Sequence, residues 1–127
     1  MKTLEQEFAI EVYSKVKDYT DKYGEGSQEL KDYSSMADRL PILVRTAGLV
    51  QTLAFVATRG KDPHKELLLH LAQVVKGTDD FEELMADSRN GNFEDYRYLT
   101  QRVNLALGWF KRFSQSVPKV EPGGEED

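Results

Sequence analysis

The feature that most constrains the fold is the apolar stretch over residues 40–57. It is apolar on nearly every side of a helix, a pattern typical of a helix enclosed by others. Arg45 and Gln51 lie inside it and it is short for a bilayer, so we do not expect it to cross a membrane. The other segments of the chain must therefore cover it.

Two residues decide how this stretch is divided. Pro41 disfavours helical dihedral angles at Leu40, so we expect a helix to end or kink there and restart. Gly48 either breaks the helix or allows another backbone to approach closely. Because the apolar character persists beyond it, we expect the helix to continue, at a cost of about 1 kcal/mol relative to alanine.

A narrow basic seam is predicted along this helix. Arg45, Thr52 and Arg59 are seven residues apart and therefore lie near one face. Two interpretations remain open. Arg45 pairs with a carboxylate such as Asp38, seven residues earlier, because buried charges are usually paired, or the seam faces an external polar partner.

The remaining helices are predicted from their ends. Thr3 with Gln6 indicates a capping box, Ser27 and Asn92 are typical helix caps, and Asp62-Pro63 indicates a further helix start. With 127 residues, we predict an all-α, compact, single-domain bundle of about five to six helices around a buried central helix. The domain should span residues 1–116, and the Pro-Gly-rich acidic tail, 117–127, should be disordered.

Composition excludes several classes of protein. The chain has no cysteine, which removes disulfides, thiolate zinc sites and cysteine nucleophiles together. It has no basic-plus-apolar N-terminal segment typical of a signal peptide and no long apolar run. We therefore predict a cytoplasmic protein that does not associate with membranes.

Charge is distributed in blocks of alternating sign. The net charge is −5, yet residues 39–78 carry six basic and two acidic residues, and residues 97–120 carry five basic and none acidic. Residues 79–96 carry seven acidic residues and one basic residue. Such asymmetry indicates a dipolar particle that could stack on copies of itself and present its basic side to RNA.

The last helix has two surfaces besides its core face. One arc is free of acidic residues and includes Lys111 and Arg112. Another strip is apolar and aromatic, formed by Tyr98, Leu105 and Trp109. This strip predicts a second packing partner, either within the fold or in a neighbouring subunit.

The sequence offers little support for catalysis. Glu66 and His70 are four residues apart and could share a metal, but a protein site requires three or four ligands, and a surface ion pair is the simpler interpretation. His64 lies on a different side of that helix. No phosphate-binding glycine loop, catalytic triad order or zinc-protease motif is present. We predict a protein that is not an enzyme and needs no metal or cofactor.

Three segments together resemble a known family. They are Lys2-Thr3-Leu4-Glu5-Gln6, the run containing Leu40-Pro41, Arg45, Gly48-Leu49, Gln51 and Leu53-Ala54-Phe55, and Leu99-Thr100 followed by Trp109-Phe110-Lys111-Arg112-Phe113. These segments are similar to the small helical subunit of the Cmr (type III-B CRISPR–Cas, RAMP module) effector complex. The resemblance implies a non-catalytic antiviral-defence subunit that stacks in multiple copies along a guide–target duplex. Its partners would be the other Cmr subunits, copies of itself, the CRISPR guide RNA and the target RNA.

The resemblance also implies where RNA would be contacted. Arg45 and Gln51 belong to the family signature, and Lys111 and Arg112 to the resembling C-terminal helix; Arg39, Arg59 and Lys61 join them through the charge blocks alone. Basic side chains would hold phosphates without reading bases. The alternative is a stand-alone helical adaptor or regulator that binds a partner protein through the Trp109 strip, and RNA-dependent purification would separate the two.

Overall fold

Helices joined by short loops make up the part of the chain that the computed structural model describes, residues 1–118. Six helices follow one another in this segment: α1 (Leu4–Tyr23), α2 (Gln28–Ala47), α3 (Leu49–Arg59), α4 (Asp62–Lys76), α5 (Phe81–Asn90) and α6 (Phe93–Ser116). The predicted all-α bundle of five to six helices is confirmed. Most of the predicted tail, from residue 119, lies outside the described residues, whereas Val117 packs partly buried against the core.

The helix starts follow the predicted capping signals. The Thr3 hydroxyl accepts from the Gln6 amide at 3.1 Å, and the Gln6 side chain accepts from the Thr3 amide at 2.8 Å. Ser27 and Asn92 accept the amides of the third helical residues of α2 and α6 at 3.2 and 2.8 Å. These bonds satisfy amides that have no partner inside the helix.

The division of the apolar stretch is the reverse of the predicted one. Helix α2 continues through Pro41, although proline removes a backbone donor. Leu40 and Val44 are buried on its inner face, so packing outweighs the local penalty. The helix ends instead at Gly48, whose φ of 89° and ψ of 160° lie in a region that is essentially restricted to glycine. The prediction of a continuous helix through Gly48 was wrong.

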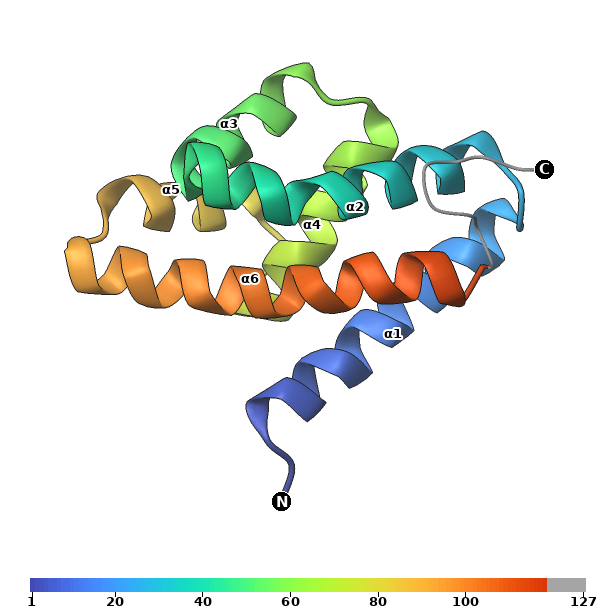
Figure 1. Cartoon of the computed structure of the whole chain (residues 1–127), viewed down its shortest axis with the longest axis horizontal. Helices are drawn as coiled ribbons and strands as arrows, with labels where there is room; N and C mark the ends of the chain where they lie inside the picture. Colours follow the sequence, from blue (N-terminus) through green and yellow to red (C-terminus); the bar gives the residue numbers. More distant parts are fainter. Residues whose placement is uncertain (119–127) are drawn as a thin grey trace.

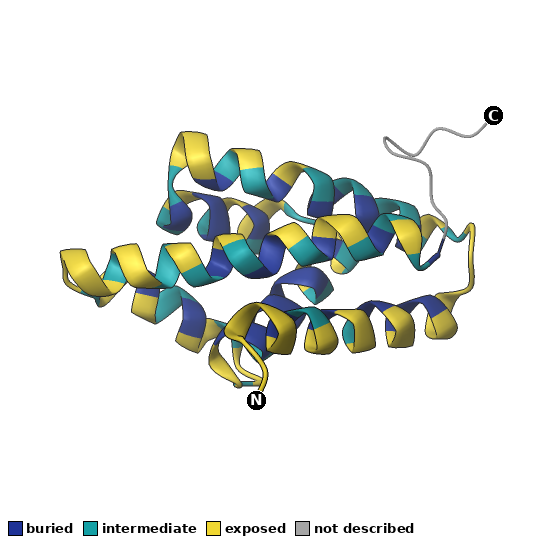
Figure 2. Ribbon diagram, turned by 60° about the horizontal axis from the view of Figure 1, so that its bottom comes forward, coloured by how far each residue is buried: buried dark blue, intermediate teal, exposed yellow. Residues whose placement is uncertain are grey.

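The helix that the others enclose is α4. It contacts each of the other described helices, and its buried residues lie on several sides: His64, Leu67, Leu68, His70, Leu71, Ala72, Val74 and Val75. In the predicted central stretch, by contrast, Ile42 and Phe55 are 52% and 49% exposed. Figure 2 shows the buried residues gathered on the inward sides of the helices.

Helices α2 and α6 lie side by side and run in opposite directions (Figure 1). Asp38 of α2 lies near Lys111 of α6, while Leu49, just beyond α2, contacts Tyr96 near the start of α6. Helix α1 crosses α6 at an angle, and its N-terminal half packs against α6 through the buried side chains of Phe8 and Val12. Within residues 1–118, none of the helices combines the length and the apolarity that crossing a membrane would require.

The predicted basic seam required Arg45, Thr52 and Arg59 to lie along one helix. Because α2 and α3 are separate helices, these residues do not share one face. Thr52 is buried, whereas Arg45 and Arg59 are exposed on different helices. Asp38 is not the partner of Arg45, since it lies 3.7 Å from the Lys111 ammonium. The interpretation that Arg45 pairs with Asp38 was therefore wrong.

Candidate nucleic-acid interface

One exposed stretch of the sequence carries basic side chains and no acidic ones, and it begins directly after Asp38. Residues 39–61 cover the second half of α2, the Gly48 junction and all of α3, and they include four basic and no acidic residues. Arg39, Arg45 and Arg59 are exposed and form no ion pair with any residue of the described segment, 1–118. A phosphate could therefore approach them without displacing an acidic side chain.

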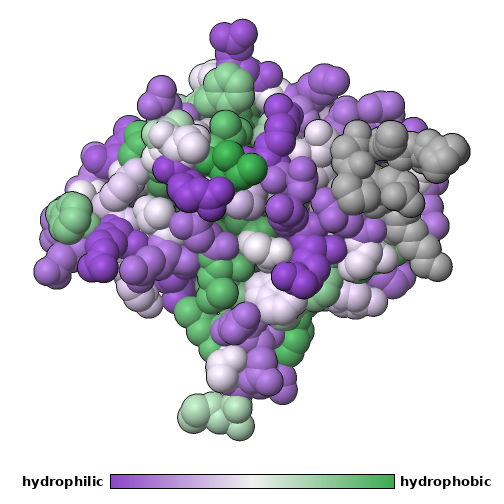
Figure 3. All heavy atoms as spheres, viewed as in Figure 1, coloured by the Kyte–Doolittle hydropathy of each residue, from purple (hydrophilic) through white to green (hydrophobic). Residues whose placement is uncertain are grey.

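We call this region the α2–α3 surface. It is formed by the exposed side chains Arg39, Ile42, Arg45, Gln51, Phe55 and Arg59. In Figure 3, the apolar groups near the junction of α2 and α3, at the upper left, form small patches among hydrophilic side chains. The surface is therefore mixed, basic and weakly apolar, rather than one broad apolar patch.

The junction at Gly48 is held by a side chain from α6. The Tyr96 hydroxyl accepts from the amides of Leu49 and Val50 at 2.9 and 3.4 Å. Gly48 has no side chain that could cap α3, so the Tyr96 hydroxyl caps the helix instead. The orientation of α3 relative to α2 is thus fixed by the first turn of α6.

Lys61 occupies a different environment from the three arginines. Its ammonium lies 3.8 Å from the Asp32 carboxylate. Both line a cleft of about 380 Å³ together with Tyr19, Tyr23, Gln28, Glu29, Asp62, Pro63 and Glu66. Four of these lining groups are carboxylates, so a polyanion near Lys61 would meet an excess of negative charge.

Lys111 and Arg112 form a second, smaller basic site on α6. Lys111 pairs with Asp38 at 3.7 Å, but both side chains are close to half exposed, and such pairs contribute about 0–1 kcal/mol. The Arg112 guanidinium lies 5.9 Å from the centre of the Trp109 ring. The structure therefore divides the six predicted RNA-contacting residues into the three arginines of the α2–α3 surface, Lys61 in the acidic cleft, and this pair.

The predicted interface strip is divided between the core and the surface. Leu105 and Trp109 are partly buried and pack against the core, with Trp109 stacked on Phe113 at 5.2 Å. Phe113 in turn meets Tyr13 of α1 at 5.6 Å. Only Tyr98 is largely exposed, at 60%. Much of the second apolar strip of α6 thus serves contacts within the fold.

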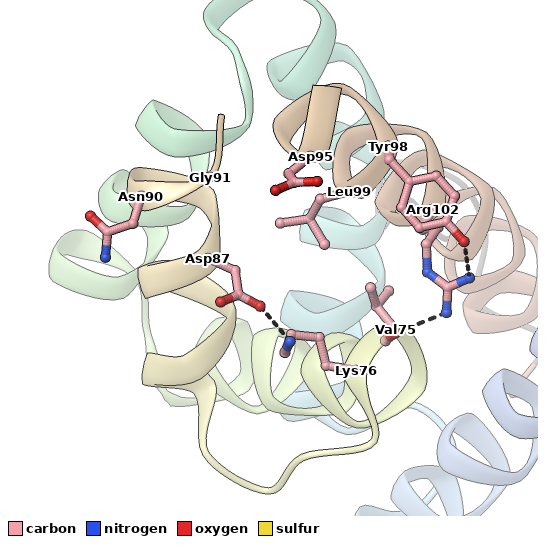
Figure 4. A pocket seen from close by; sticks show the side chains of 9 residues that line it. All are labelled: Val75, Lys76, Asp87, Asn90, Gly91, Asp95, Tyr98, Leu99 and Arg102. Atoms are coloured by element: carbon pink, nitrogen blue, oxygen red, sulfur yellow. Dashed lines mark hydrogen bonds and ion pairs between the residues drawn. The ribbon is translucent and has the colours of Figure 1, made fainter. Parts of the chain in front are cut away.

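Tyr98 also borders a cleft of about 540 Å³ between the end of α4, α5 and α6 (Figure 4). Arg102 crosses this cleft and donates to the Val75 carbonyl at 3.1 Å and to the Tyr98 hydroxyl at 3.3 Å. Lys76 and Asp87 form an ion pair on its other side. These interactions join three helices, so the charged groups serve as structural connections.

The two histidines belong to the interior. The Tyr33 hydroxyl lies 2.7 Å from His70 Nδ1, and His70 Nε2 lies 3.3 Å from a Glu66 oxygen. Burial, assisted by Lys15 and Lys22, lowers the pKa of His70 to about 4, despite the nearby carboxylate. Neutral His70 can therefore accept the Tyr33 hydroxyl proton at Nδ1, while its Nε2 faces the Glu66 carboxylate.

The predicted contact between Glu66 and His70 is present at 3.3 Å, but its histidine lies in the interior and not on the surface, and the pair is not ionic at neutral pH. His70 is only 8% exposed, and its lowered pKa leaves it uncharged. Over residues 1–118, no cluster of three or more potential metal ligands surrounds it.

Sequence reasoning missed three residues that shape this region. The capping contact of Tyr96 spans 47 positions, which is beyond the reach of local patterns. The sequence analysis did not identify Arg102. Its contact with Tyr98 was nevertheless predictable, because residues four apart lie next to each other on a helix. Phe55 was read as part of an enclosed helix, because the Gly48 break that exposes it was not predicted.

The family is decided by comparison with known proteins. The family model described as CRISPR-associated protein (Cas_Cmr5) matches residues 4–117, nearly all of the described chain. The chain belongs to the Cmr5 family. The resemblance noted in the sequence to the small helical Cmr subunit is thus confirmed.

A protein sequence and a solved structure that match this Cmr5 family member both come from Thermus thermophilus. The protein named CRISPR system Cmr subunit Cmr5 is 45% identical over 117 residues, covering 92% of this chain and 97% of that protein. The X-ray crystal structure of a CRISPR-associated Cmr5 family protein matches with a TM-score of 0.81 at 46% identity, covering 91% of this chain and 97% of the other. The Cmr5 fold thus accounts for essentially the whole bundle.

Proposed function

We propose that this Cmr5 family chain is a non-catalytic structural subunit of a cytoplasmic type III-B CRISPR ribonucleoprotein that targets invading RNA. In this proposal it stacks in several copies beside the guide–target duplex and contacts the RNA backbone. Its partners are the other Cmr subunits, further copies of itself, the guide RNA and the target RNA. Family membership supports the assembly role, and the surface charge supports the contact with RNA.

The observation that carries the RNA contact is the set of arginines on the α2–α3 surface that form no ion pair. Arg39, Arg45 and Arg59 project from it without an acidic partner in the described residues. Guanidinium groups suit phosphate recognition because their fixed fork of donors matches phosphate oxygens. Contacts of this kind hold the backbone in position without reading its sequence.

The decisive experiment reverses two of these charges in the assembled complex. We expect Arg45→Glu with Arg59→Glu to weaken target-RNA capture by at least about tenfold, because two phosphate contacts become repulsive. The slope of log affinity against log salt should fall by about 0.7 per lost contact on single-stranded RNA. Titration of labelled target RNA at several salt concentrations measures both quantities.

The control is Lys2→Glu with Lys65→Glu, which makes the same change in net charge at exposed positions outside the α2–α3 surface. Capture should stay within about twofold of the unmodified complex. Normal assembly with unchanged capture in the arginine variant would remove the α2–α3 surface from the RNA contact. Lys111→Glu with Arg112→Glu, in the same assay, tests whether α6 contributes a second contact.

A further inference from the structure

We propose that Phe55 is a stacking platform for an unpaired RNA base, flanked by Gln51 and Arg59 on the exposed face of α3. This inference rests on the proposed function, because it assigns a specific contact to the surface proposed to meet RNA. It adds the prediction that the RNA has at least one nucleotide splayed from its neighbours where α3 lies. Phosphate contacts alone do not require such a nucleotide.

The first observation is the position of Phe55 on α3. Gln51, Phe55 and Arg59 are successive positions four apart, so they follow one another along one side of α3. Each step is about 6 Å along the axis, from the rise of 1.5 Å per residue. All three side chains are exposed. An amide, an aromatic ring and a guanidinium thus lie in one row.

The second step is that the Phe55 ring is free, unlike most other exposed aromatic rings. In the described chain, Tyr13 lies edge-on to Phe113, and Tyr23 packs against Tyr19. Tyr98 lies beneath the Arg102 guanidinium. Within the same residues, Phe55 has no aromatic or cation–π partner and is 49% exposed. Its face is available to an incoming planar group.

The charged residues near Phe55 indicate which kind of planar group would bind to its ring. The other exposed phenylalanine, Phe93, is followed directly by Glu94 and Asp95, which would repel a polyanion. Phe55 instead has no acidic residue in its own helix, and Arg59 lies one turn away on the same side of α3. Single-stranded nucleic acids are typically bound by aromatic faces for the bases beside basic groups for the phosphates. The observations therefore favour RNA over a protein partner, which would require a more continuous apolar patch.

The test compares four single variants in the reconstituted complex with labelled target RNA as the probe. Stacking on an aromatic ring contributes about 1–3 kcal/mol per base, which corresponds to about 5- to 150-fold in affinity. We expect Phe55→Ala and Phe55→Leu each to weaken capture by at least about 5-fold, and Phe55→Tyr to retain it. Phe93→Ala is the matched control and should change nothing. Thermal melts of the isolated subunits check that each variant folds.

Two further readouts identify the contact. The salt slope should be unchanged in Phe55→Ala, since no charge is lost, whereas Arg45→Glu with Arg59→Glu should reduce it. Target RNA containing 4-thiouridine should crosslink under ultraviolet light to the tryptic peptide 46–59, which contains Phe55. This crosslink should be lost in Phe55→Ala.

The outcomes separate this inference from the proposed function. If the Phe55 variants bind normally while the arginine variant loses RNA, the stacking platform is wrong and the proposed function stands. If Phe55→Ala prevents incorporation into the complex while Phe55→Leu restores it, Phe55 is an apolar contact with a protein subunit, and the inference is again wrong. If the arginine variant also binds RNA normally, both proposals fail.

Discussion

His70 shows how a single buried side chain links this fold to pH. Its ring contacts Tyr33 and lies 6.0 Å from the ring of Tyr19, inside the bundle. Burial raises the pKa of Tyr33 well above its usual value, so the phenol keeps the proton that it donates to His70 Nδ1. Since His70 is neutral when folded, protonation opposes folding.

We therefore expect stability to fall as the pH falls from about 6.5 toward 4. In the unfolded chain, the pKa of His70 is near 6.5, whereas in the folded chain it is about 4. As the pH falls, the unfolded state therefore takes up the proton first. Between pH 7.5 and pH 5, His70 should reduce the free energy of unfolding by about 2 kcal/mol, with His64 acting in the same direction because its pKa is also lowered. Urea unfolding at the two pH values measures this loss.

His70→Gln provides the comparison, because glutamine does not titrate in this range. The variant should lose less stability than the unmodified protein between the same two pH values, whatever its stability at pH 7.5. An equal loss in both proteins would show that His70 is not held neutral by the fold.

At the scale of helices, Gly48 and Pro41 show where the sequence was informative and where it was not. The helix ends at Thr3, Ser27 and Asn92 were predictable because a cap is a local interaction over three residues. The passage of α2 through Pro41 was not, because it depends on residues of other helices packing against Leu40. The Gly48 break is also stabilised from a distance, by Tyr96.

The α2–α3 junction is tested by replacing its glycine. We expect Gly48→Ala to destabilise the protein by about 1–3 kcal/mol, because φ of 89° with ψ of 160° strains any residue that has a Cβ atom. The added Cβ would also lie 3.5 Å from the Tyr96 hydroxyl, which is an ordinary contact, so the backbone strain should dominate. Chemical denaturation gives the free energy directly.

Gly108→Ala is the matched control within α6. Its Cβ would meet nothing within 4 Å, so alanine should stabilise the helix by about 0.5–1 kcal/mol. A Gly48→Ala variant as stable as the unmodified chain would mean that α2 and α3 can join as one helix, as the sequence alone had suggested.

At the scale of the molecule, the basic residues were predictable as charge blocks but not as a surface. The sequence placed Arg45 and Arg59 on one helix, whereas the structure places them on two, joined at Gly48. Lys61 belonged to a basic block, yet folding brings it beside Asp32. Charge near a residue in sequence says little about charge near it in space.

The overall charge makes a further prediction about the isolated subunit. With a net charge of −5, the full chain should bind target RNA no tighter than about 10⁻⁵ M near physiological salt, in the range of non-specific binding. With about three phosphate contacts, raising the salt from 50 to 200 mM should weaken binding by about 20-fold. Fluorescence anisotropy with labelled RNA measures both; tight binding that is insensitive to salt would contradict an electrostatic contact.

The hydroxyl group of Tyr96 also has a consequence for the order in which the molecule is completed. Helix α3 leaves the ribosome long before α6, yet the amides at its start find their partner 47 residues later in the chain. Until Tyr96 is synthesised, the amides of Leu49 and Val50 lack the side chain that caps them in the folded protein. The start of α3 is therefore completed only after the first turn of α6 has been made.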